Sequence, residues 1–193
     1  MTPGLLIKEG PRIRIRQLRE DDVPRMTVRA FGGEEGARRW YAQELAKGDG
    51  ASDEFRQFAV ETNDGEFIGF TGFYGEPGAD AGGYFAIDEP YRGRGYGTEL
   101  VRCVLEVIFE DCGAARCVID YHDWNEVAGR LYRKFGFREI QRIPIPEDKL
   151  TDEDRRYAPG RQVYAIVIAV TREEFDASRK ASPGYRISNK ELS

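Results

Sequence analysis

A glycine-rich turn between a strand pattern and a helix pattern constrains this chain more than any other feature. The turn Tyr91–Thr98 has the sequence YRGRGYGT, and it separates the apolar run Gly83–Ile87 from the amphipathic run Leu100–Phe109. At such a turn, and at the start of a helix, unpaired backbone N–H groups point toward one place, which suits a phosphate group. Glycine lets a ligand approach the backbone closely and permits positive φ. The turn therefore predicts a strand, a phosphate-binding loop and a helix in mid-chain.

The composition is that of a single globular domain without a membrane span. The chain has 193 residues, of which 40% are hydrophobic and 33% charged, and it has no apolar run of the length that a membrane helix needs. The segment Met1–Pro11 carries no signal pattern, so we expect a cytoplasmic protein that does not act on membranes. A formal net charge of −5 disfavours nucleic acid as the main partner and favours a cationic one.

The cysteines and the histidine do not form a metal-binding pattern. Cys103, Cys112 and Cys117 lack CxxC spacing, and His122 is the single histidine. We therefore expect reduced, mostly buried thiols and no metal site.

Hydrophobic periodicity predicts an α+β fold around a mostly antiparallel sheet, because helices and strands mix without strict βα alternation. The expected strands are 12–16, 55–61, 66–74, 83–88, 115–121, 137–143 and 162–170. The expected helices are 23–31, 34–47, 100–109, 125–134 and 171–178. The residues 62–65, TNDG, predict a hairpin turn, whereas 75–82 and 144–160 are expected to be loops and 183–193 a loose tail.

Two helices have a predicted core face. In the first, apolar residues recur at helical spacing, at Val101, Val104, Leu105 and Ile108. In the second, we expect the residues Val127, Leu131 and Phe135 to point inward.

The glycine turn alone leaves several functions open. It is compatible with a dinucleotide-binding fingerprint, another nucleotide loop or an ordinary tight turn. A Walker motif is absent, because no Gly-Lys-Ser/Thr follows the turn. A dinucleotide-binding fold would place the turn early in the chain, whereas here it follows a hairpin in mid-chain.

A second motif one strand later narrows these alternatives. The segment Asn125–Phe137 has the sequence NEVAGRLYRKFGF. With the glycine turn, it resembles the Gcn5-related N-acetyltransferase (GNAT) family over roughly residues 12–170. The family's turn, Gln/Arg-x-x-Gly-x-Gly/Ala, is matched by Arg92, Gly95 and Gly97. Its later element is matched by Asn125, Ala128, Tyr132, Lys134, Gly136 and Phe137.

The resemblance implies a single GNAT-like domain over residues 1–172, with a splayed strand pair in its central sheet and helices on its faces. A short helix and a loose tail would occupy 173–193. It also implies acetyl-CoA as co-substrate without a metal. The strand 85–87 would carry the family's bulge, and its exposed backbone would pair with pantetheine while an N–H near Ile87 stabilises the oxyanion. The implied cofactor-binding residues are Phe85, Ala86, Ile87, Arg92, Gly93, Arg94, Gly95, Tyr96, Gly97, Thr98 and Asn125.

The same resemblance implies direct acetyl transfer to an amine, with Tyr132 protonating the departing thiolate. The base stays open among five residues near the expected site, with Asp120 as first choice: Asp88, Glu89, Asp120, His122 and Asp123. Residues 97–132 have a weaker similarity to aminoglycoside 6′-acetyltransferases, and the polyamine and ribosomal-protein branches share much of the pattern. We expect a small primary amine, with a polycationic amine as one candidate and a protein N-terminus as the competing one.

Two alternatives to an acetyltransferase accompany this expectation. One is a CoA-binding sensor, and the other is a nucleotide-binding domain unrelated to CoA. The positions of Trp40 and Tyr41 on an expected helix are equally compatible with lining an acceptor pocket and with core packing. A homodimer is expected only by analogy with the family.

Overall fold

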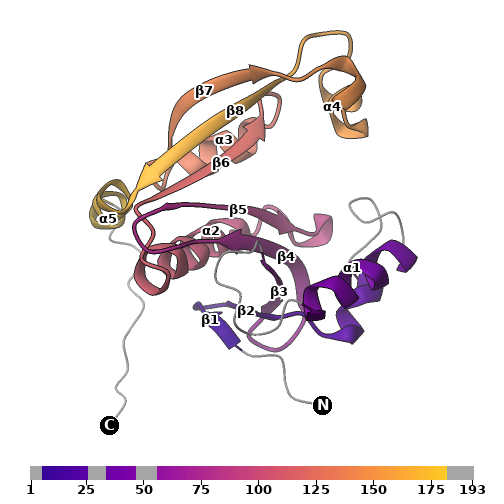
Figure 1. Ribbon diagram of the computed structural model, residues 1–193, viewed down its shortest axis with the longest axis vertical. Helices are drawn as coiled ribbons and strands as arrows, with labels where there is room; N and C mark the ends of the chain where they lie inside the picture. The colour runs from indigo at the N-terminus through magenta and orange to yellow at the C-terminus, as the bar shows by residue number, and fades with distance from the viewer. Residues whose placement is uncertain (1–5, 26–33, 47–55, 182–193) are drawn as a thin grey trace.

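One mixed sheet forms the centre of the molecule (Figure 1). The computed structural model describes residues 6–25, 34–46 and 56–181. In these residues eight strands follow the order β1-β2-β3-β4-β5-β6-β8-β7, and each neighbouring pair is antiparallel except β5 with β6. The predicted fold class is therefore confirmed. The strands are β1 (Leu6–Glu9), β2 (Ile13–Gln17), β3 (Arg56–Thr62), β4 (Phe67–Tyr74), β5 (Asp80–Ile87), β6 (Arg116–His122), β7 (Arg138–Pro144) and β8 (Tyr164–Thr171).

Helical segments flank both faces of the sheet (Figure 1). On one face, Ala59 and Phe67 pack with Val23 and Tyr41, which come from η1 and α1. The opposite face packs on α2 and α3 in one continuous core. The helical segments are η1 (Glu20–Arg25), α1 (Glu34–Ala46), η2 (Glu89–Tyr91), α2 (Tyr96–Glu106), η3 (Val107–Asp111), α3 (Glu126–Arg133), η4 (Glu147–Lys149), α4 (Asp152–Tyr157) and α5 (Arg172–Ala181).

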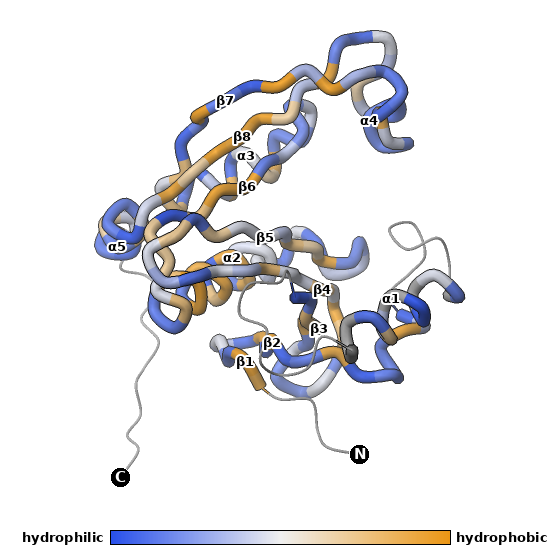
Figure 2. Tube along the Cα trace, viewed as in Figure 1, coloured by the Kyte–Doolittle hydropathy of each residue, from blue (hydrophilic) through white to orange (hydrophobic). Residues whose placement is uncertain are grey.

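The amphipathic helix α2 lies at the centre of that core. The four core residues predicted for the helix 100–109 are fully buried, as expected: Val101, Val104 and Leu105 in α2, and Ile108 in the following segment η3. Figure 2 shows the hydrophobic residues gathered on α2 and along β6 and β8, whereas α4 is mostly hydrophilic. Phe175 of α5 packs against Phe109 and Phe135, so the C-terminal helix contributes to the same core. No helix among the described residues is long and apolar enough to cross a membrane.

The predicted hairpin turn joins β3 and β4. Gly65 has φ of 93° and donates its N–H to the oxygen of Thr62 at 2.9 Å. Beyond the turn, the register shifts so that Val60 pairs with Gly69 but Glu61 pairs with Phe67, which leaves Ile68 as the extra residue. This bulge turns Ile68 toward α2 while Phe67 and Phe70 lie on the side of η1 and α1.

Several sequence-based expectations were wrong. Of the expected helix 23–31, residues 23–25 belong to the 3-10 helix Glu20–Arg25, which begins three residues earlier, and residues 26–33 lie outside the described residues. Strand β5 begins at Asp80, within the expected loop 75–82. The expected surface loop 144–160 contains η4 and α4. Val127 is 69% exposed, because α3 turns Tyr132 and Gly129 toward the core in its place. Strand β1 was not predicted, and the tail 183–193 lies outside the described residues.

Candidate active site

Strands β5 and β6 diverge from a narrow end (Figure 1). Their paired positions are Asp80 with Arg116 and Ala81 with Cys117, after which the two strands separate. Arg116 closes the narrow end with two hydrogen bonds to the Asp80 carboxylate, at 3.0 and 2.6 Å. The splayed pair is therefore confirmed.

The bulge, however, was expected on the wrong strand. Strand β5 pairs with β4 in unbroken register from Gly82 to Ile87, and the register shift lies at Ile68 in the pairing of β4 with β3. The free backbone groups of β5 come from its position beside the splay, because β6 leaves it after Ala81.

The backbone of β5 presents alternate residues to the splay. Asp88 donates its N–H to the oxygen of Ile68 at 2.9 Å, which sets the hydrogen-bond alternation along the β4–β5 ladder. By that alternation Ala86 bonds to β4, while the main-chain groups of Phe85 and Ile87 face the separating strand β6. The splay thus offers the N–H groups of both residues and the C=O of Phe85 to an extended ligand, whereas the oxygen of Ile87 already accepts Arg92 Nε.

The glycine-rich turn lies between β5 and α2 and contains two left-handed residues. Gly93 and Gly95 have φ of 74° and 87°, a conformation that favours glycine. No atom lies within 4 Å of where a Cβ of Gly93 would be. Gly95 is the N-cap of α2 and provides no side-chain cap, so the first N–H groups of the helix, from Tyr96 and Gly97, are left for a ligand. This open turn fits a phosphate group.

The two arginines of the turn differ in their contacts. Arg92 donates from Nε to the oxygen of Ile87 at 2.8 Å, which fixes the exit of the chain from β5. Arg94 is exposed, and its guanidinium carbon lies 5.8 Å from the centre of the Tyr91 ring. Thr98 donates its N–H to the oxygen of Gly95 at 3.1 Å, as part of the first helical turn. Both arginines therefore lie at the rim of the predicted phosphate site.

Helix α3 supplies the residues of the second motif. Asn125 is its N-cap, and its Oδ1 accepts the N–H of Ala128 at 3.1 Å. A cap through Oδ1 is compatible with a role of the side-chain NH2 as a donor to pantetheine. Tyr132 lies about two helical turns after Asn125. This places it beneath the splay, with its ring centre 5.9 Å from those of Phe85 and Tyr121.

Tyr132 is a buried phenol beside a cavity. It is 8% exposed and lines a pocket of about 320 Å³ with Tyr121, Gly129 and Phe137 among its walls. Burial, together with the charge of Asp120, raises the pKa of Tyr132, so its proton is retained at neutral pH. Gly129 permits this packing, because a Cβ there would lie 2.8 Å from the Tyr121 hydroxyl.

The five candidate bases are no longer equivalent. Asp123 accepts hydrogen bonds from Arg161 at 2.7 Å and from the Tyr164 N–H at 3.3 Å, so it has a structural role. Asp120 is exposed and lies two residues before His122 on the same side of β6, opposite Tyr121.

Two further candidates, Asp88 and Glu89, follow β5. Asp88 is half-buried, and that burial raises its pKa although the charge of Arg92 lowers it. Glu89 is exposed at the start of η2. Among the described residues, no group of three His, Cys, Asp or Glu residues could hold a metal ion.

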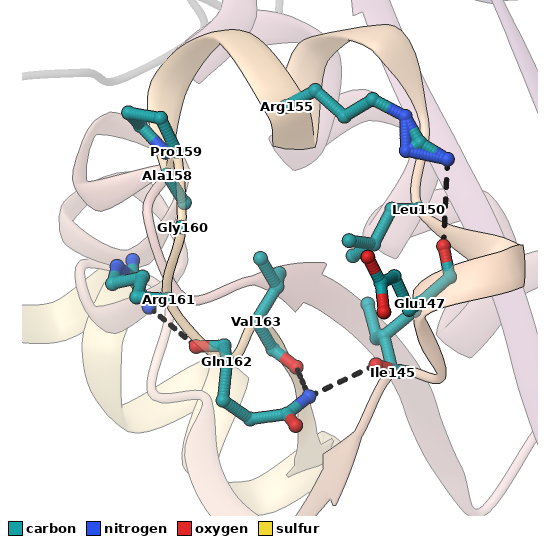
Figure 3. Close-up of a pocket in the computed structure, with 10 residues that line it drawn as sticks. All are labelled: Ile145, Glu147, Leu150, Arg155, Ala158, Pro159, Gly160, Arg161, Gln162 and Val163. Atoms are coloured by element: carbon teal, nitrogen blue, oxygen red, sulfur yellow. Dashed lines mark hydrogen bonds between the residues drawn. The ribbon is translucent and has the colours of Figure 1, made fainter.

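The unpredicted helix α4 contacts the end of strand β6 through the side chain of Asp154, which meets His122 and Trp124. This fully buried carboxylate accepts from Trp124 Nε1 at 2.6 Å and lies 2.5 Å from His122 Nδ1. It also closes a capping box with Thr151, a Thr-x-x-Asp pattern that was readable in the sequence. Next to α4, a pocket of about 480 Å³ opens inside the ring of residues 145–163, and Leu150 and Val163 point toward its middle (Figure 3).

The cysteines are unsuited to nucleophilic chemistry. Cys103 and Cys117 are buried and unpaired, and burial raises the pKa of each thiol to about 12. At neutral pH they are thiols and not thiolates. Burial of these two cysteines agrees with the expectation of mostly buried thiols, whereas Cys112 is half-buried.

Comparison with known proteins identifies the family. A family model described as an acetyltransferase (GNAT) domain matches residues 12–138. The chain belongs to the GNAT family of N-acetyltransferases. A relative from Bacillus subtilis (strain 168), the SPbeta prophage-derived uncharacterized N-acetyltransferase YokL, is 29% identical over 141 residues, which are 72% of this chain and 71% of the relative.

Solved GNAT structures share the fold. RimJ from Mycobacterium smegmatis, in complex with CoA-disulfide, has a TM-score of 0.69 at 17% identity, with 90% of each chain covered. Spermidine N-acetyltransferase from Vibrio cholerae, in complex with CoA and spermine, has a TM-score of 0.67 at 15% identity, with 84% of this chain and 97% of the other covered. Both of these structures contain CoA or its disulfide, and both share the fold of this chain.

Proposed function

We propose that this GNAT protein transfers the acetyl group of acetyl-CoA directly to a primary amine. The observation that carries the proposal is the coincidence of three features around the divergence of β5 from β6. The backbone of Phe85 and Ile87 faces the splay. The open glycine turn follows β5 and leads into α2. Tyr132 lies beneath the splay, against Phe85.

The chain's own residues would hold acetyl-CoA at two places. The N–H groups of the turn from Gly93 to Gly97, with Arg92 and Arg94 at the rim, suit the diphosphate. The free backbone of β5 and the amide of Asn125 suit the extended pantetheine arm. When bound, acetyl-CoA supplies an activated thioester, and the N–H of Ile87 faces the side on which its carbonyl oxygen would gather charge.

Proton transfer requires one donor and one acceptor. Tyr132 keeps its proton at neutral pH and would deliver it to the departing sulfur. The amine enters as an ammonium ion and must lose a proton before attack, for which Asp120 is our choice. Asp120 lies on the face of β6 opposite Tyr121, so the amine would approach from the side away from Tyr132.

The acceptor that we propose is a small amine with more than one positive charge. Asp88, Glu89 and Asp120 place carboxylates near the open end of the splay, and the chain carries a formal net charge of −5. The spermidine acetyltransferase with the same fold acts on such an amine. A protein N-terminus is the second candidate, favoured by the ribosomal-protein-S5-alanine acetyltransferase from Vibrio fischeri, which has a TM-score of 0.65 to this chain. We place the enzyme in the cytoplasm, where acetyl-CoA is available, and propose a homodimer by analogy alone.

Calorimetry and an amine screen test the proposal separately. Acetyl-CoA and CoA should bind with similar affinity, and ATP should bind much more weakly because it lacks the pantetheine arm. Equal or better binding of ATP would contradict the CoA site. Thiol release with spermidine, an aminoglycoside and an alanyl peptide then ranks the acceptors. Binding of acetyl-CoA without thiol release from any amine would favour the CoA sensor.

A further inference from the structure

Arg12 belongs to neither sequence motif, yet its side chain lies against the glycine-rich turn. Its Nη1 donates to the main-chain oxygen of Arg94 at 3.0 Å, and its guanidinium carbon lies 4.9 Å from the centre of the Tyr96 ring. A Cβ on Gly95 would lie 3.1 Å from Arg12 Nη2. The guanidinium therefore lies against Gly95, the left-handed residue that is the N-cap of α2.

A buried carboxylate fixes the position of this arginine. Glu99 is 2% exposed, and its Oε2 accepts from Arg12 Nε at 2.9 Å. Its Oε1 accepts the N–H of Arg12 at 2.7 Å and that of Ile13 at 3.2 Å. A buried charge is costly unless it is paired and hydrogen-bonded, and here both of its oxygens bind residue 12. The pair thus orients both the main chain and the side chain of Arg12 relative to α2.

Close packing before β2 supports the same arrangement. A Cβ on Gly10 would lie 2.8 Å from Glu99 Oε1 and 3.0 Å from Cys103 Sγ, so only glycine allows this approach without displacement. The side chain of Asn63 also donates to the oxygen of Gly10 at 3.2 Å. The turn that carries Arg12 is therefore held from two directions.

We propose that Arg12 is a positioning residue for the phosphate-binding turn of this enzyme. By binding the Arg94 oxygen and covering Tyr96, it sets the direction of the N–H groups that follow Gly95. Its side chain is 44% exposed, so it also adds a third positive charge beside Arg92 and Arg94. This inference rests on the proposed binding of acetyl-CoA at the turn.

The test compares acetyl-CoA with S-acetylpantetheine, a donor that lacks the diphosphate. In Arg12→Met, calorimetry should show acetyl-CoA binding weakened about tenfold or more, because a charge-assisted contact and the orientation of the turn are lost. KM for acetyl-CoA should rise with kcat little changed, and kcat/KM for S-acetylpantetheine should stay within twofold. Arg12→Lys should be intermediate. The matched control, Arg172→Met, removes an exposed arginine on α5 and should bind acetyl-CoA like the wild type.

The outcomes separate the two proposals. A wild-type protein that does not bind acetyl-CoA would contradict the proposed function itself. Normal wild-type binding with an Arg12→Met affinity within twofold would overturn the role of Arg12, as would equal losses with both donors. If Arg12→Met fails to fold because the buried carboxylate of Glu99 loses the charge of Arg12, Arg12→Lys keeps a cation opposite Glu99 and carries the comparison.

Discussion

Tyr132 is buried and lies beneath the diverging strands. These two properties determine how loss of its hydroxyl should affect turnover and acetyl-CoA binding. Tyr132→Phe keeps the ring that packs against Phe85, Tyr121 and Phe137 and removes only the hydroxyl. We expect turnover to fall about a hundredfold or more, the usual contribution of a positioned general acid, with acetyl-CoA affinity changed less than threefold. Thiol release and calorimetry measure the two quantities.

The matched control for that variant is Tyr121→Phe, which removes a neighbouring hydroxyl. The ring centre of Tyr121 lies 5.9 Å from that of Tyr132, the same distance as the ring centre of Phe85. Its turnover should stay within a few-fold of the wild type. Equal losses in both variants would mean that packing, and not proton transfer, is what the hydroxyl of Tyr132 provides. Unchanged turnover in Tyr132→Phe would assign the proton to water or another group.

If Asp120 removes the proton of the amine, replacing it should slow the reaction by an amount that depends on pH. Asp120→Asn leaves the residue exposed on β6 but abolishes the carboxylate. The reaction then depends on amine that is already neutral in solution, and a primary amine loses its proton only near pH 10. We expect the pH–rate profile of kcat/KM to shift to higher pH, with the rate partly restored there. A profile that keeps its shape and position would exclude Asp120 as the base.

At the scale of the elements, local sequence patterns predicted the helices and turns whose packing follows from their own spacing of apolar and glycine residues. Helix α2 and the glycine turn were found because apolar spacing and positive-φ residues act locally. The bulge was misplaced, because it depends on the register of β3 with β4 and not on one strand. Val127 was assigned inward because it shares the helical spacing of Leu131, but the contact of Gly129 with Tyr121 rotates α3 differently.

The helix α4 was missed because its sequence is charged and bounded by prolines, which is typical of a loop. Its stability comes from a tertiary contact, the buried Asp154 with Trp124 and His122, that no local pattern reports. Arg12 was missed for the same reason, since its partners Arg94 and Glu99 lie far along the chain. The candidate site was thus predictable where it consists of motifs and hidden where distant residues support them.

The attachment of α4 leads to a prediction on stability. Burial disfavours the charge of Asp154, but hydrogen bonds from Trp124, Thr151 and His122 outweigh it and hold its pKa below the ordinary value. A lowered folded-state pKa stabilises the protein above the unfolded value, near pH 4, and that contribution is lost as pH falls through the folded value. Asp154→Asn should lower Tm by several degrees at pH 7, and the difference should shrink below about pH 4.

Thermal unfolding followed by circular dichroism from pH 7 to pH 3 measures this effect. Asp152→Asn is the matched control, because Asp152 is exposed in the first turn of the same helix and should change Tm little. A difference between Asp154→Asn and wild type that stays constant down to pH 3 would show that the carboxylate's charge does not stabilise α4.

At the scale of the whole molecule, the two halves of the sheet share few backbone contacts but one core. Pairing of β5 with β6 covers two positions, whereas the buried cluster runs without a break from Ile13 of β2 through α2 to Ile168 of β8. A hydrophobic core that both halves share couples their unfolding, because neither half can expose its side of the core without the other. We therefore expect one two-state transition, with equal calorimetric and van't Hoff enthalpies.

Acetyl-CoA provides the sharpest test of that coupling, because its proposed site lies where the halves diverge. At about 100 times its Kd, a ligand that binds only the folded state stabilises it by about 2.7 kcal/mol. For a domain of this length, that corresponds to a rise in Tm of about 5–10 °C. Since the core is continuous, the whole transition should move and remain single in scanning calorimetry. Splitting into two transitions, of which acetyl-CoA moves only one, would mean that the halves unfold independently and that the ligand binds within one half and does not span the splay.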